Sequence, residues 1–139
     1  MIRKFALVFG IIYLVVGILG FVPPLAPHTA EGPHPAVHVS HGYLLGLFPI
    51  NLVHNFVHIG VGLWGILGSK SLSGARGFGR GLAILYGLLT VLGLIPATSM
   101  LFGLAPIHGH DIWLHAGSAL VAAYFGFVAP ADTERPAHA

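Results

Sequence analysis

Three histidines have the residue type and spacing of a metal site. His54 and His58 are four residues apart, which places them one turn apart on a helix, and His115 lies in a later apolar segment. Three imidazoles together are suited to zinc, copper, iron or nickel. One interpretation of these histidines is therefore a transition-metal site, with copper or zinc as the first candidates. Polar residues that could orient these imidazoles by hydrogen bonds are Asn51, Asn55 and Asp111.

Two other uses of the same histidines remain open. His58 and His115 could ligate a haem or a chlorophyll-type pigment, either from two sides or singly. Alternatively, each histidine forms an ordinary hydrogen bond across a helix bundle, a contact worth about 1 kcal/mol. Tyr13 and Tyr86 are expected to serve in packing and hydrogen bonding near these histidines, and a redox role is less favoured.

A second group of histidines is expected on the opposite side of the membrane from the basic residues. These side chains could collect copper or zinc, or form a proton-sensitive patch near pH 6.5. The alternative is a solvated polar loop. From Ala36 onward the segment could form a short interfacial helix, or dip back toward the membrane before Pro49. The external candidates are His34, His38, His41, His108 and His110.

The motifs of common enzymes are missing from the sequence. It contains no cysteine and no paired carboxylates, and it has no serine–histidine–acid arrangement. The glycines of segment 77–81 lack the preceding strand and the lysine of a phosphate-binding loop. We therefore expect a protein that is not an enzyme. A small transporter is a less favoured alternative, because few membrane-buried charges are available.

The composition requires these residues to be positioned inside a membrane. Hydrophobic residues make up 55% of the chain and charged residues only 7%, so a water-soluble fold could not cover its own surface. The sequence predicts an all-α, integral membrane four-helix bundle. Apolar runs close to the ~20 residues that a bilayer requires are about Phe5–Val22, Ile50–Gly68, Phe78–Ile95 and Ile107–Ala129.

Two stretches of the chain repeat one another. Residues 46–50 read Gly-Leu-Phe-Pro-Ile and residues 103–107 read Gly-Leu-Ala-Pro-Ile, and each proline stands nine residues before a histidine, His58 or His115. This pattern predicts a single domain, residues 1–139, built from two duplicated transmembrane hairpins. Repeat 1 covers about residues 5–68 and repeat 2 about residues 78–129, followed by a flexible tail at 130–139.

The basic residues predict the orientation. They fall before the first helix, around the second connection and after the fourth helix, while the first and third connections contain none. By the positive-inside rule, both the N- and C-termini are cytoplasmic. No basic patch on a soluble face is expected, so nucleic acid is excluded as a partner.

Helical spacing groups the polar side chains on one side of each helix. His54 and His58 share a stripe with small residues, and Asp111 and His115 do the same on the fourth helix. Because polar groups in lipid must face protein, we expect His54, His58 and His115 to converge inside the bundle, with Tyr13 and Tyr86 nearby.

The run Asn51-Leu52-Val53-His54-Asn55-Phe56-Val57-His58 resembles a family signature. The pattern N-x-x-H-N-x-x-H belongs to small four-helix bacterial membrane proteins that form a domain of unknown function, and Asp111-Ile112-Trp113-Leu114-His115 is similar to the second motif of that family. The resemblance implies the fold and a bacterial inner (cytoplasmic) or photosynthetic membrane, since segment 42–49 is similar to versions from photosynthetic bacteria.

The function expected from the sequence is an accessory or structural subunit of a membrane assembly. The expected partners are the lipid bilayer and either a homo-oligomer or a larger membrane complex, because no soluble domain is present. The alternative is a histidine-based protein that binds a transition metal, haem or pigment.

Overall fold

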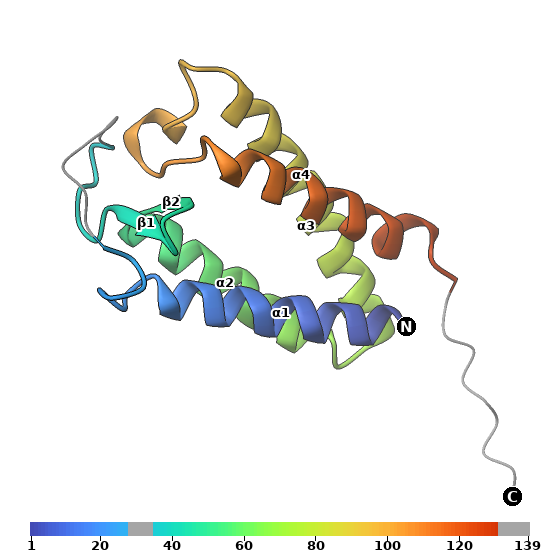
Figure 1. Ribbon diagram of the computed structural model, residues 1–139. Helices are drawn as coiled ribbons and strands as arrows, with labels where there is room; N and C mark the ends of the chain where they lie inside the picture. The colour runs from blue at the N-terminus through green and yellow to red at the C-terminus, as the bar shows by residue number, and fades with distance from the viewer. Residues whose placement is uncertain (28–34, 131–139) are drawn as a thin grey trace, which may run out of the picture.

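The computed structural model describes residues 1–27 and 35–130, and the chain is mostly helical, as the composition predicts. Helices α1 and α2 form one layer, and α3 and α4 form a second layer above it (Figure 1). A two-stranded antiparallel hairpin lies at one end. The elements are α1 (Ile2–Leu19), β1 (Gly42–Leu44), β2 (Phe48–Ile50), α2 (Leu52–Gly68), α3 (Leu72–Leu94), a 3-10 turn η1 (Leu101–Gly103), α4 (His110–Ala123) and a π-helical turn η2 (Tyr124–Val128).

Within residues 1–27 and 35–130, three helices are long and apolar enough to cross a membrane by length and composition: α1, α3 and α4 with its π-helical continuation, His110–Val128. Helix α2 is shorter, with 17 residues, because the preceding residues Phe48–Ile50 pair in the hairpin. It still runs along α1. These helices are those of a membrane protein.

Glycines allow each pair of helices to pack at short range. A Cβ added to Gly62 of α2 would lie 2.5 Å from the backbone nitrogen of Leu14 in α1, and one added to Gly10 would lie 2.6 Å from the nitrogen of Ile66. In the second layer, a Cβ on Gly126 would lie 2.6 Å from the nitrogen of Arg80. Small residues therefore set the distance between backbones in both layers.

The two layers are joined at one end by aromatic residues. The ring of Phe5 in α1 stacks on Phe125 with 4.5 Å between centroids and lies 5.9 Å from Phe78 in α3. Basic side chains gather at this end, where the Arg3 guanidinium donates a hydrogen bond to the carbonyl of Ser69. Arg80 donates to the carbonyl of Gly126, so it satisfies an acceptor near the end of η2.

Two predictions about the connections are wrong. The segment after Ala36 forms the β1–β2 hairpin, with Gly42 opposite Ile50, in place of an interfacial helix. The second connection is also shorter than expected. Helix α3 begins at Leu72 because the Ser71 side chain caps it by accepting a hydrogen bond from the nitrogen of Gly74.

Some predictions fall outside the described residues. His34 lies in the segment 28–34, and the predicted flexible tail lies in 131–139 except for Pro130.

Candidate metal centre

Asn51 fixes the start of α2 and thereby the position of His54. Its side-chain oxygen accepts a hydrogen bond from the backbone nitrogen of His54 (2.9 Å), as an N-cap does. Its amide nitrogen donates to the carbonyls of Val37 (3.1 Å) and Leu104 (2.8 Å). Asn51 therefore connects the α1–β1 and α3–α4 connections to the first turn of α2, whereas the sequence suggested that it orients an imidazole.

His54 and His58 are held in defined tautomers by backbone carbonyls. His54 Nδ1 lies 3.0 Å from the carbonyl oxygen of Pro106, and His58 Nδ1 lies 3.1 Å from the carbonyl oxygen of His54. A carbonyl only accepts hydrogen bonds, so each Nδ1 carries the proton and donates it. In the neutral imidazoles, the lone pair is then on Nε2. The two rings stack with centroids 4.6 Å apart.

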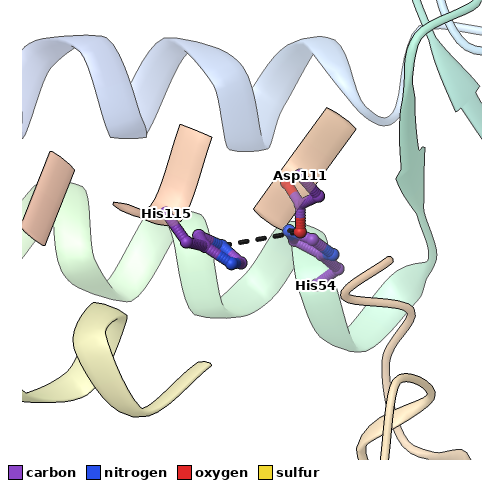
Figure 2. Close-up of side chains that lie close together, drawn as sticks. All are labelled: His54, Asp111 and His115. Carbon is purple, nitrogen blue, oxygen red and sulfur yellow. Dashed lines mark ion pairs between the residues drawn. The ribbon is translucent and has the colours of Figure 1, made fainter. Parts of the chain in front are cut away.

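Asp111 and His115, one turn apart on α4, complete a cluster with His54 (Figure 2). Asp111 Oδ2 lies 3.5 Å from His115 Nε2 and 3.9 Å from His54 Nε2. All three side chains are buried. Among the described residues, these are the three histidine or acidic side chains close enough to hold a metal ion, with their ligand atoms within 4.8 Å of one another.

The spacing of these atoms is close to that of a metal site. Bonds of about 2.0–2.2 Å to nitrogen and oxygen separate neighbouring ligand atoms of a tetrahedral ion by roughly 3.4 Å. The separation between Asp111 and His115 matches this value, and that between Asp111 and His54 exceeds it by a few tenths of an ångström. The ligand atoms of His54 and His115 also lie within 4.8 Å of each other.

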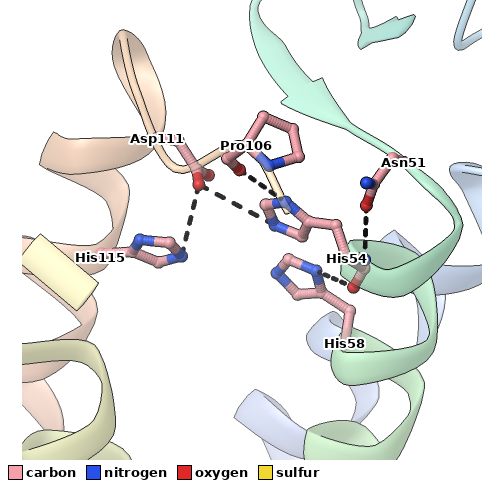
Figure 3. A network of polar contacts seen from close by, with 6 residues as sticks. All are labelled: Asn51, His54, His58, Pro106, Asp111 and His115. Atoms are coloured by element: carbon pink, nitrogen blue, oxygen red, sulfur yellow. Dashed lines mark hydrogen bonds and ion pairs between the residues drawn. The ribbon is translucent and has the colours of Figure 1, made fainter. Parts of the chain in front are cut away.

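Figure 3 shows His54 and His58 reaching from α2 toward Asp111 and His115 on α4. His58 stands beside the three-residue cluster. Its Nε2 is buried and has no hydrogen-bond partner, and the same holds for Nδ1 of His115. The three predicted histidines lie together, with the rings of His58 and His115 4.6 and 6.3 Å from that of His54. Asp111 is the third member of the group whose ligand atoms lie within 4.8 Å of one another.

Two tyrosines border the histidines. The ring of Tyr13 lies 5.5 Å from His58, and the ring of Tyr86 lies 4.7 Å from His115 and 5.3 Å from Tyr13. Both tyrosines are buried. They therefore line the histidine cluster on the side toward the aromatic end of the bundle.

Asn55 faces away from the cluster. A Cβ added to Gly20 of α1 would lie 2.1 Å from the Asn55 side-chain oxygen, so the amide packs against α1. Of the histidines predicted to be external, His41 is buried, His108 is half-buried, and His38 and His110 are exposed. In the part of the chain that the structure describes, they do not form a three-ligand group.

The space beside the histidines is small for a tetrapyrrole. Cavities of about 50 and 200 Å³ adjoin His58, whereas pockets for drug-sized ligands occupy roughly 300–1,000 Å³. A haem or pigment between His58 and His115 would require the helices to separate.

The sequence indicated Asp111 as a residue that could orient an imidazole, although not as a member of the ligand group, and it contained no signal for the Pro106 carbonyl. The internal repeat contained a signal for the position of Asp111. Asp111 stands at the position that matches His54, as His115 matches His58, so the aspartate belongs to the same stripe of the second repeat.

The chain is thus a mostly helical membrane protein with a buried histidine–aspartate cluster. It belongs to the family described as "Domain of unknown function (DUF4383)", which matches residues 3–128. No curated protein and no solved structure matches the chain.

Proposed function

We propose that this protein binds a divalent transition-metal ion through His54, Asp111 and His115. The carrying observation is the orientation of His54. Because its Nδ1 donates to the Pro106 carbonyl, its Nε2 lone pair faces the Asp111 carboxylate oxygen at 3.9 Å. A lone pair and a carboxylate oxygen are both acceptors and need a cation between them. Carbonyl-oriented imidazoles of this kind are typical of metal ligands.

The donor set favours zinc or iron. Two imidazoles and one carboxylate hold zinc in sites that keep an open position, and the same set holds non-haem Fe(II). The proposal therefore keeps zinc from the predicted pair of copper and zinc, and adds iron in place of copper. We prefer metal binding to the accessory-subunit interpretation. The proposal describes binding and includes no reaction.

Metal content of the purified full-length protein tests the proposal. After incubation with zinc in nanodiscs and removal of free ion, we expect one zinc per chain by elemental analysis, and cobalt substitution should give visible bands of a nitrogen- and oxygen-ligated ion. His115→Ala should weaken zinc binding more than about 100-fold, because even residues that only orient ligands contribute 10–100-fold.

His110→Ala is the matched control. His110 lies on the same helix and next to Asp111 but is exposed, so its loss should leave the zinc content unchanged. Equal zinc content in the two variants, or none in the unaltered protein, would overturn the proposal. A proton shared between Asp111 and a histidine would then be the cation that joins them.

A second part of the proposal concerns the topology of the helices. We propose two duplicated hairpins with cytoplasmic termini. Support for the duplication comes from the backbone, since Leu45–Gly46 and Phe102–Gly103, at matching places in the repeat, all have positive φ. Assembly into a homo-oligomer or a larger membrane complex stays a prediction. Location in a bacterial inner or photosynthetic membrane, and the match to the two family signatures, are also still predictions. Large apolar side chains on the outer faces, such as Trp64, Phe56 and Tyr124, are available to lipid or to a partner.

A further inference from the structure

A cavity of about 200 Å³ lies between the two layers, at the end that carries the β1–β2 hairpin. Its walls come from α1, the hairpin, α2 and α4. The described residues that line it are apolar except at one place, where His54, His58 and Asp111 meet. The cavity therefore combines an apolar body with a small polar base, as ligand sites commonly do.

The rim of this cavity is apolar. Leu45 at the tip of the hairpin is 62% exposed and Leu114 on α4 is 42% exposed, and both line the cavity. Leu114 lies on a helix that is long and apolar enough to cross a membrane, where an exposed leucine faces lipid. A molecule dissolved in the bilayer would therefore reach the cavity without passing through water.

The polar base offers a hydrogen-bond acceptor that nothing in the described chain uses. His58 donates from Nδ1 to the carbonyl of His54, so its lone pair is on Nε2. That atom is buried and has no hydrogen-bond partner. His58 is 4% exposed and lies outside the proposed metal-binding set. A ligand that satisfies it must carry a donor.

We propose that this cavity binds a membrane-dissolved primary alcohol, whose unbranched apolar chain lies against Val16, Leu44, Phe48 and Leu114 and whose hydroxyl donates to His58 Nε2. The cavity is smaller than the roughly 300–1,000 Å³ used for drug-sized ligands, so it holds only the hydroxyl end of the chain. The remaining carbons extend past the exposed rim residues Leu45 and Leu114 into lipid. This inference goes beyond the proposed metal site and does not require a bound ion.

Photo-cross-linking of the full-length protein in nanodiscs tests the proposal. The probe is a sixteen-carbon primary alcohol with a diazirine at mid-chain, and the labelled peptides are identified by mass spectrometry. We expect label concentrated in segments 44–50 and 110–116. Unlabelled 1-hexadecanol should reduce it at least fivefold, whereas hexadecane, which lacks the hydroxyl, should not.

Two tryptophan variants separate the cavity from the general lipid surface. Leu114→Trp should fill the cavity and lower the cross-linking at least fivefold. Val121→Trp, two turns further along the same face of α4 and similarly exposed, should leave it unchanged. If Leu114→Trp does not fold, Val16→Trp fills the same cavity from α1.

His58→Phe should keep the cross-linking but remove the preference for hexadecanol over hexadecane as competitor. Label spread evenly over lipid-facing residues, or equal competition by the two compounds in the unaltered protein, would overturn the inference. Zinc content is measured on the same samples. Normal zinc binding without selective label would reject the alcohol site alone, and selective label without zinc would reject the metal site alone.

Discussion

Asp111 is the acidic side chain on which the electrostatics of the bundle depend. It is 1% exposed, and among the described residues it is the single acid. An ionised carboxylate buried without a partner costs several kcal/mol, so a cation must accompany it. The two neighbouring histidines supply either metal ligands or a proton acceptor. The cation beside Asp111 is therefore either a metal ion or a proton, and the zinc experiment decides between these two.

His108 makes a testable contribution to pH dependence. Partial burial lowers the pKa of His108 below its usual value near 6.5. As the pH falls through 6.5, the unfolded chain then takes up this proton before the folded chain does, so the free energy of unfolding decreases. We expect His108→Gln to reduce the fall in Tm between pH 7.5 and pH 5.

The effect should be small, about 1–2 °C, because His108 is only half-buried. Thermal unfolding of metal-free protein at the two pH values measures it. His110→Gln, an exposed neighbour, is the control and should lose as much Tm on acidification as the unaltered chain. A fall in Tm that is the same for all three proteins would contradict the prediction.

The types of the site residues could be predicted from the sequence, but their atomic roles could not. The four-residue spacing placed His54 and His58 on one face of a helix. Which nitrogen faces the cluster depends on the carbonyl of Pro106, 52 residues away from His54. Periodicity contains no information about such a contact, so the orientation of the His54 ring could not be predicted from the sequence.

At the scale of the elements, the contact between α1 and α2 depends on glycine. Gly62 faces the backbone of Leu14, whereas a Cβ on Gly60 would meet nothing within 4 Å. We expect Gly62→Ala to destabilise the protein by about 1–3 kcal/mol, the usual cost of overpacking. Gly60→Ala should be neutral or stabilising by up to about 1 kcal/mol, because alanine favours helix.

Thermal stability in detergent, followed by size-exclusion chromatography of heated samples, measures the difference. Both variants replace a glycine of α2 with alanine, so the helix propensity of alanine alone would change their stability equally. Equal Tm values for Gly60→Ala and Gly62→Ala would show that the close approach of α1 and α2 does not contribute to stability.

The helices themselves were predictable, because long apolar runs and glycine stripes specify them locally. The β1–β2 hairpin was not. Its turn has positive φ at Leu45 and Gly46, and leucine is not a residue that normally signals such a turn. The pairing of Gly42 with Ile50 therefore overrode local propensity, and it shortened α2 relative to the predicted run Ile50–Gly68.

On the scale of the whole molecule, the two layers are joined differently at their two ends. At one end they meet through the rings of Phe5, Phe78 and Phe125. At the other end they meet through polar contacts such as those of Asn51 with Leu104 and of His54 with Pro106. Both cavities beside the histidines lie at this polar end. The proposed ligand site therefore lies at the end where polar contacts join the layers.

The orientation of the molecule in the membrane can be tested because the chain has no cysteine. Ser73 at the start of α3 and Ala97 just beyond its end are both exposed, so each accepts a single cysteine for labelling. Lys70, Arg76 and Arg80 flank the first position, and the positive-inside rule assigns that end to the cytoplasm. We expect a membrane-impermeant maleimide to label Ala97→Cys in intact spheroplasts and Ser73→Cys only after permeabilisation. The reverse pattern would invert the bundle, so that the histidine–aspartate cluster lies near the cytoplasmic face and any metal must come from inside the cell.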